Sequence, residues 1–209
     1  MCCRFVVART VGEIQTIFEA DELIGELPGV SYNVAPTQPI AIIVDRAFEK
    51  APDGSPLGEL SREIHSARWG LVPRWSKGPA EGAPLINGRI ESLLEKPSFN
   101  DSVIRRRCVI PASGYYEWHV NADGTKQPFY INAGTDGMFA LAGLFVSFPS
   151  VNESNGTIHA GVFFIHERVG HYPFAEHILV SQMFEVEEYF FLRFVDDDGA
   201  LDRVTFFGE

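Results

Sequence analysis

The sequence predicts a single α+β domain, a strand-rich sheet or barrel core with a few helices. Three observations support this class. The 209 residues suffice for one domain with a substantial core and are few for two. Hydrophobic residues make up 45% of the chain and charged residues 22%, which is ordinary for a globular protein. Short runs rich in β-branched and aromatic residues recur along the chain, whereas helical periodicity is found in only two segments.

The first elements are a strand and a helix. Residues 3–8 form a short apolar run typical of a strand. Thr10 and Glu13 then form a capping-box pattern, so we expect a helix over 11–26, ended by Pro28-Gly29.

The middle of the chain mixes loops with one long strand. Residues 32–44 indicate a loop that leads into a buried strand, and residues 50–60 a turn or loop. Residues 64–75 begin as a strand and end in an irregular aromatic loop. Residues 87–106 predict two short helices broken at Pro97.

Strands dominate the remainder. The apolar runs at 107–120 and 127–132 are joined through “NADG”, which predicts a hairpin. Two further strands are expected over 138–148 and 157–166, and we assign no structure beyond them.

The charge argues against a general nucleic-acid binder, because such proteins are basic and this chain carries a net charge of −11. The acidity is uneven, however. Residues 150–209 hold 11 acidic and 3 basic residues, whereas the rest of the chain is close to balance. A local basic groove is therefore compatible with the first three quarters of the chain.

The chain has neither a run of 18 apolar residues nor the segments of a secretory signal. We therefore expect a cytoplasmic protein that does not enter a membrane. Its three cysteines are too few for a disulfide framework, and the six histidines show no metal-ligand spacing with them. We expect no metal and no other cofactor.

Cys2 becomes the first residue once the initiator Met is removed, which is usual before a small residue. A terminal cysteine offers a thiol and a free α-amine two carbons apart, both partly nucleophilic near neutral pH. The pair can trap an aldehyde as a Schiff base at the amine and then as a thiazolidine closed by the sulfur. Cys3 cannot do this, because its nitrogen is in an amide. A small apolar residue that begins a strand fits Cys2 equally well.

Glu117 lies among aromatic residues in “GYYEW”. In a strand, Glu117 and Tyr115 point to one face, and Tyr116 and Trp118 to the other. An aromatic pocket would suit the carboxyl group to general acid–base chemistry. A surface carboxylate on a half-buried strand is the alternative.

Other polar and aromatic residues are candidates for binding. The amide of Asn87 can orient a ring oxygen or an amine, and Arg89 can hold a phosphate. His166 follows an apolar run and fits a proton shuttle, while Trp69 fits stacking on unpaired bases. Each also fits an ordinary structural role, as a helix cap, a solvated charge, a structural histidine or a core aromatic.

Taken together, these segments resemble one family. The initial Met-Cys is followed in order by “YNVAPTQ”, “RWGLVPRW”, “NGRIES”, “EKPSF”, “RRRCVIPASGYYEW”, “AGLF” and “IHER”. The set resembles the SRAP family, named for SOS-response-associated peptidases, over about residues 1–168 and most specifically around 66–118. The resemblance implies one SRAP-like domain over residues 1–209, with 169–209 as a divergent tail.

The resemblance also implies a function, covalent capture of abasic sites in single-stranded DNA. In the family, the mature N-terminal cysteine crosslinks to the ring-opened sugar aldehyde as a stable thiazolidine, which shields the lesion from strand cleavage. By resemblance, Asn87 positions the amine and the sugar, Glu117 is the acid–base group and His166 shuttles protons, with Cys2 as the crosslinking residue. The DNA contacts implied are Arg4, Asn33, Pro36, Trp69, Arg89 and Arg168.

As an enzyme, the protein would combine lyase-type crosslinking with removal of its own Met1. The resemblance implies a monomer without a cofactor, cytoplasmic and associated with the nucleoid when bound to DNA.

The sequence departs from the family pattern at several positions. Cys3 replaces the usual Gly, and Gly88 replaces Ala in the family's Asn-Ala-Arg triplet. The expected His-x-Arg-Met-Pro reads “HERVG” over 166–170, so His171 and His177 compete for the histidine role.

Two other functions stay open. Cys2, with its own amine or His166 as base, fits an N-terminal-nucleophile thiol peptidase. The acidity and the altered tail fit a degenerate module that binds DNA noncovalently and in a salt-sensitive manner.

Overall fold

The computed structural model describes residues 4–50, 56–73, 75–76, 85–88, 92–132, 137–148 and 157–162. Two helices lie in these ranges, α1 (Val11–Ile17) and α2 (Asn100–Arg105). One sheet contains β2 (Glu22–Ile24), β4 (Pro39–Lys50), β5 (Pro56–Trp69), β6 (Arg107–Ala112), β9 (Phe139–Phe148) and β10 (Thr157–Val162). The other contains β1 (Phe5–Val7), β3 (Ser31–Val34), β7 (Gly114–Val120) and β8 (Lys126–Asn132).

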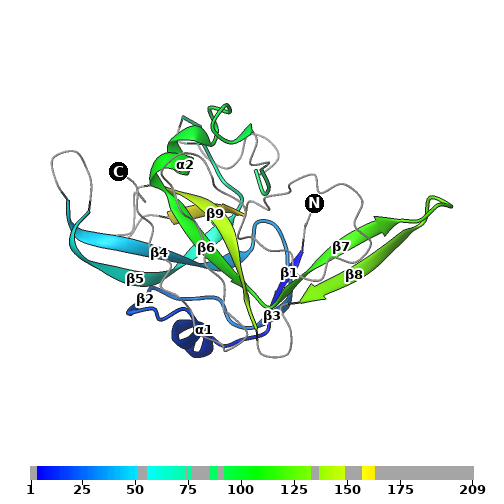
Figure 1. The fold of residues 1–209 in the computed structure, drawn as a ribbon, viewed down its shortest axis with the longest axis horizontal. Helices are drawn as coiled ribbons and strands as arrows, with labels where there is room; N and C mark the ends of the chain where they lie inside the picture. Colours follow the sequence, from blue (N-terminus) through cyan, green and yellow to red (C-terminus); the bar gives the residue numbers. More distant parts are fainter. Residues whose placement is uncertain are drawn as a thin grey trace.

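The larger sheet runs in the order β10-β9-β6-β4-β5-β2, and the smaller in the order β3-β1-β7-β8 (Figure 1). Because β10 pairs antiparallel with β9 and also parallel with β5, the circuit β10-β9-β6-β4-β5 closes into a small barrel. The predicted class, a strand-rich α+β domain, is confirmed. No helix in the described ranges has the length and apolar character needed to cross a membrane.

The buried strand predicted near residue 40 is β4, and its two faces pack against different partners. Ile40 and Ile42 lie in the cluster that contains Trp69, whereas Ala41 and Ile43 lie in the cluster formed with α1. Because both faces are covered, the run is continuously apolar instead of alternating with polar residues.

Helix α1 begins as predicted and ends early. The side chain of Thr10 accepts the N–H of Glu13 at 3.3 Å, and the Glu13 carboxylate accepts the N–H of Thr10 at 2.7 Å, which completes the capping box. The helix stops far short of residue 26. Arg62 of β5 donates to the carbonyl of Phe18 at 3.0 Å just after the last turn, and β2 then pairs with β5. Tertiary pairing therefore overrides the local helical pattern.

Other boundaries differ for the same reason. Residues 32–34, predicted as loop, belong to β3 because this segment pairs with β1. Residues 56–60, also predicted as loop, belong to β5 and pair with β4. Of the two helices predicted over 87–106, the described residues contain only α2, preceded by turns over 93–99. The strands predicted from 138 and from 157 are confirmed as β9 and β10.

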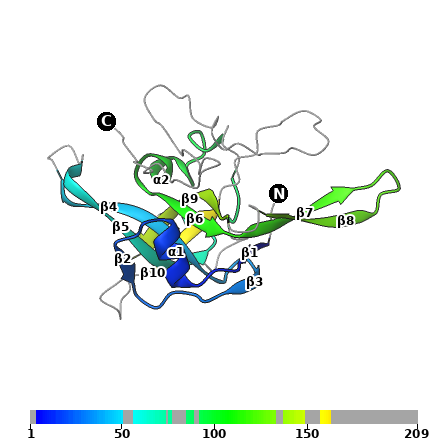
Figure 2. The same ribbon diagram turned by 60° about the horizontal axis from the view of Figure 1, so that its bottom comes forward.

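Strands β7 and β8 form a hairpin that projects from the barrel, as Figures 1 and 2 show; we call it the arm, residues 114–132. The turn predicted from “NADG” is confirmed, since the N–H of Gly124 donates to the carbonyl of Asn121 at 2.9 Å. Gly124 has a φ of 82°, a conformation that glycine adopts without strain.

The base of the arm is packed too closely for a side chain at Gly114. A Cβ there would lie 2.5 Å from the ring of Tyr130 and 2.6 Å from the backbone oxygen of Ile131. We predict that Gly114→Ala lowers the free energy of unfolding by about 1–3 kcal/mol, since the backbone must shift. Chemical denaturation measures the change. Gly12→Ala is the matched control, because Gly12 of α1 has open space around it, and equal losses in both variants would contradict the prediction.

Cys108 of β6 is buried in the core, and desolvation raises the pKa of its thiol well above the ordinary value. A raised pKa keeps the sulfur protonated at neutral pH, and the thiolate is the reactive form. We predict that a maleimide leaves Cys108 unmodified in the native protein and modifies it after denaturation. Peptide mass spectrometry after pulse labelling measures this, and fast native labelling of Cys108 would contradict it.

Candidate functional site

Arg4, the first described residue, connects two strands of the smaller sheet. Its guanidinium donates from Nη1 to Oδ1 of Asn33 in β3 at 2.9 Å. Its carbonyl accepts the backbone N–H of Tyr116 in β7 at 3.1 Å. Arg4 is half-buried and Asn33 is exposed. Two of the predicted DNA contacts are thus in direct contact with each other, beside the base of the arm.

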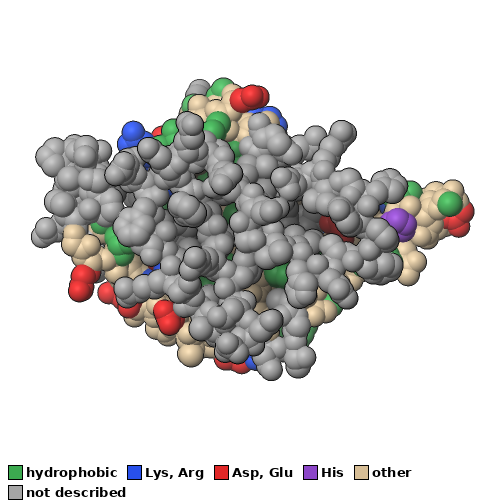
Figure 3. Space-filling view, viewed as in Figure 1, with side chains coloured by type: hydrophobic (Ala, Val, Ile, Leu, Met, Phe, Trp, Pro, Cys, Tyr) green, Lys and Arg blue, Asp and Glu red, His purple; other side chains and the backbone are tan. Residues whose placement is uncertain are grey.

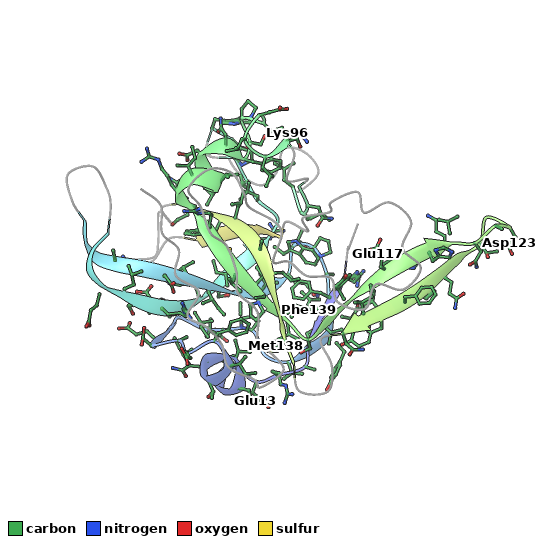
Figure 4. The ribbon with its side chains drawn as sticks, viewed as in Figure 1. Glu13, Lys96, Glu117, Asp123, Met138 and Phe139 are labelled. Atoms are coloured by element: carbon green, nitrogen blue, oxygen red, sulfur yellow. The ribbon has the colours of Figure 1, made fainter. Side chains whose placement is uncertain are left out.

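Glu117 lies midway along β7, in the arm (Figure 4). The predicted alternation of side chains is confirmed, because the ring of Tyr115 packs against Phe139 in one direction and the ring of Tyr116 against Tyr130 in the other. Glu117 shares the face of Tyr115 and is half-buried. A carboxyl group with partial access to solvent, next to aromatic rings, can exchange protons with a bound molecule.

Trp69, at the end of β5, is wholly buried, so the prediction that it stacks on unpaired bases is wrong. Its exposed fraction is 0%. Its ring meets the ring of Phe5 edge-on at 5.1 Å, and its Nε1–H donates to the carbonyl of Ile86 at 3.2 Å. A buried indole whose N–H has found a protein acceptor is a core residue and has no face left for a base.

Asn87 and Pro36 lie on two loops, each of which is hydrogen-bonded to Trp69. Asn87 directly follows the residue bound by the indole; it is half-buried, and its amide oxygen is buried. Pro36 lies in a turn where the N–H of Thr37 donates to the carbonyl of Trp69 at 2.8 Å. In return, the N–H of Trp69 donates to the carbonyl of Gln38 at 2.9 Å.

Thr37 is a residue that the sequence analysis missed. Its φ of 73° is in the left-handed region, which β-branched residues rarely adopt. The backbone N–H and the carbonyl of Thr37 both form hydrogen bonds. The N–H donates to the carbonyl of Trp69, and the carbonyl accepts Nε–H of Arg68 at 3.1 Å. The prolines in “APTQP” were the available signal, but they indicate a turn without saying which residue takes the strained conformation. Strain held in this way is typical of functional loops.

The described site residues gather around the Phe5–Trp69 pair, by which we mean these two rings in contact. Each of these site residues is at most two positions along the chain from a residue that contacts one of the two rings' residues. The contact is a strand pairing or packing contact with Phe5, or a hydrogen bond with Trp69. They are Arg4, Asn33, Pro36, Asn87 and Glu117. Four other predicted site residues lie outside the described ranges: Cys2, Arg89, His166 and Arg168.

On the face drawn in Figure 3, acidic side chains of the described ranges are seen along the lower left edge, at the top of the molecule and at the tip of the arm. Asp123 is labelled at that tip in Figure 4. Within the described residues, no three His, Cys, Asp or Glu side chains are grouped closely enough to hold a metal ion.

Comparisons with known proteins give consistent matches. A family model described as SOS response associated peptidase (SRAP) matches residues 1–164. “Abasic site processing protein YoqW” of Bacillus subtilis (strain 168) is 38% identical over 146 residues, which are 69% of this chain and 60% of that protein. “Abasic site processing protein HMCES” of Rattus norvegicus is 38% identical over 111 residues, 48% of this chain and 29% of that protein.

The structural comparison supports the fold. A crystal structure of a protein from Bacteroides thetaiotaomicron matches with a TM-score of 0.59 at 19% identity, covering 78% of this chain and 67% of that one. A protein from Bordetella bronchiseptica matches with a TM-score of 0.56 at 18% identity, over 78% of this chain and 71% of that one. The chain spans about 60% of the length of the Bacillus relative it matches.

Proposed function

The chain belongs to the SRAP family, and on that premise we propose that it captures abasic sites in single-stranded DNA through a covalent bond to Cys2. The two sequence relatives carry names that describe abasic site processing. The chain begins Met-Cys, so removal of Met1 frees an amine and a thiol on one residue. An abasic sugar is a masked aldehyde, and an aldehyde is what such a pair traps.

The observation that carries the proposal is the hydrogen bond between Arg4 and Tyr116. Two residues of extended chain span at most about 7 Å, so the α-carbon of Cys2 lies within that distance of the α-carbon of Arg4. The carbonyl of Arg4 is 3.1 Å from the backbone nitrogen of Tyr116, the residue directly before Glu117. The amine and thiol of a mature Cys2 can therefore reach a half-buried carboxyl group.

The chemistry balances without an oxidant or a cofactor. Glu117 takes the proton of the sugar's anomeric hydroxyl and returns a proton to the ring oxygen, which opens the ring to the aldehyde. The Cys2 amine, oriented by Asn87, adds to the aldehyde carbon, and loss of one water leaves a Schiff base. The Cys2 sulfur then adds to that carbon, its proton goes to the nitrogen, and a thiazolidine results. In this scheme His166 shuttles protons.

Binding of the DNA backbone precedes the chemistry. The hydrogen bond from Arg4 to Asn33 of β3 fixes the direction of the guanidinium directly before β1. We assign phosphate contacts to Arg4, Arg89 and Arg168, and further DNA contacts to Asn33 and Pro36. Such contacts hold the strand without regard to its sequence.

The test uses the full-length protein after removal of Met1 and a single-stranded oligonucleotide with one abasic site. We expect a band that keeps its shifted mobility after heating in detergent. Its intact mass should equal protein plus DNA minus one water. An oligonucleotide of the same sequence without the lesion should give no such band. If protein that lacks Met1 forms no heat-stable adduct, the proposal is wrong.

A peptidase is the second candidate, favoured by the description of the family as a peptidase. Here the Cys2 thiol would attack a peptide carbonyl, with its own amine as base. Peptide cleavage that disappears in Cys2→Ala, without any DNA adduct, would favour it. Salt-sensitive retention of DNA that survives Cys2→Ala, again without an adduct, would instead favour a noncovalent binding module.

A further inference from the structure

We propose that Trp69 is a positioning residue, whose indole N–H, acting through the carbonyl of Ile86, fixes Asn87 relative to the start of the chain. The inference rests on the function proposed above for the placement of substrate. Neither the family resemblance nor the comparisons give Trp69 this role, and its burial excludes the DNA contact expected from the sequence.

Trp69 contacts three different segments of the candidate site. Its ring packs edge-on against Phe5, the residue after Arg4, at 5.1 Å. Its backbone exchanges two hydrogen bonds with the turn that carries Pro36, at 2.8 and 2.9 Å. Its Nε1–H donates to Ile86 at 3.2 Å, directly before Asn87. A single residue thus links three segments that are distant in the sequence, two through its side chain and one through its backbone.

The indole contact matters for Asn87 because it is made to the carbonyl of the residue directly before it. Residues 85–88 are joined to the end of β5 at two neighbouring points. The N–H of Leu71 donates to the carbonyl of Leu85 at 3.0 Å, and the indole donates to the next carbonyl along. Only the second of these anchors is adjacent to Asn87. Removing the indole N–H takes away the described hydrogen bond that lies directly next to Asn87.

Position matters more than packing for a residue that orients a nucleophile. A displacement of about 1 Å at a reacting group can cost about a hundredfold in rate. Loss of the indole N–H should therefore lower the rate of crosslinking while leaving phosphate contacts intact. A tryptophan that served the core alone would affect stability and leave the rate per folded molecule unchanged.

The experiment compares Trp69→Phe with a matched core variant, Ile42→Val. Both residues belong to the same hydrophobic cluster, but only Trp69 donates a hydrogen bond to residue 86. We expect Trp69→Phe to lower the single-turnover crosslinking rate about 10- to 100-fold. Its affinity for lesion-free single-stranded DNA should change less than twofold. Ile42→Val should leave both quantities unchanged, and in an Asn87→Ala background Trp69→Phe should have no further effect.

Hydrogen–deuterium exchange of residues 85–88 tests the anchor without DNA. The exchange should speed up in Trp69→Phe and not in Ile42→Val. If Trp69→Phe does not fold, replacing Trp69 by its benzothienyl analogue keeps the shape of the indole and removes the N–H. Unchanged exchange, or equal rate losses in both variants, would overturn the proposal. Two results together would separate this proposal from the proposed function: no crosslink with the unmodified protein, and faster exchange at 85–88 in Trp69→Phe but not in Ile42→Val. The proposed function would then be wrong, and the role of Trp69 in holding residues 85–88 would be supported.

Discussion

Cys2→Ala is expected to abolish the heat-stable adduct, lowering its rate of formation by about three orders of magnitude or more. Alanine keeps the terminal amine, so a Schiff base can still form, but without the sulfur it cannot close to a thiazolidine and reverts by hydrolysis. A denaturing gel after heating measures the loss. Reduction with cyanoborohydride should still trap the Schiff base of the variant, which separates loss of the sulfur from loss of folding.

Cys3→Ala is the matched control for Cys2→Ala. It removes a neighbouring thiol whose nitrogen is in an amide, so we expect the adduct to form at an undiminished rate. Cys108 serves as an internal reference, because its buried thiol has a raised pKa. A heat-stable adduct of normal yield in Cys2→Ala would refute the thiazolidine, and its loss in Cys3→Ala would move the reactive sulfur by one residue.

Features set by local chemistry were predictable from the sequence. The capping box of Thr10 and Glu13 and the “NADG” turn each depend on residues within five positions, and both are found. The alternation of Tyr115 and Tyr116 follows from strand geometry alone.

Features set by pairing between distant segments were not predictable. The early end of α1 depends on Arg62, 44 residues from the carbonyl of Phe18 to which it donates. Strand β3 exists because β1 lies beside it, and its own residues carry no comparable signal. Closure of the barrel needs β10 to meet β5, two strands that are far apart in the chain. Such contacts are properties of the whole fold.

In the candidate site too, some features were predictable from the sequence and others depended on the fold. The resemblance to the SRAP family predicted Arg4, Asn33 and Asn87 as site residues, because shared motifs have the same residue types at corresponding positions. It did not distinguish a residue that touches DNA from one that holds such residues in place. Trp69 illustrates this, since an aromatic residue in a loop-like motif fits both roles and only its burial decides between them.

Glu117→Gln is expected to slow crosslinking about 10²- to 10⁴-fold near neutral pH, the usual contribution of a general acid–base group. Glutamine keeps the size of the side chain and its place on the face of β7 that it shares with Tyr115, but it can neither take up nor release the proton that ring opening requires. Affinity for lesion-free single-stranded DNA should be nearly unchanged, because phosphate contacts do not involve this group. The measurement is the single-turnover rate with saturating protein.

The matched control is Glu22→Gln, which makes the same change at an exposed carboxylate of β2, at the edge of the larger sheet rather than in the arm. We expect it to react at the unmodified rate. Ring opening is the step that Glu117 serves, so a substrate whose aldehyde is already free should recover much of the rate lost in Glu117→Gln. An oligonucleotide with a terminal aldehyde on an open linker provides that test. Equal slowing of both substrates would place Glu117 at the Schiff-base step, and an unchanged rate with the abasic site would remove it from the mechanism.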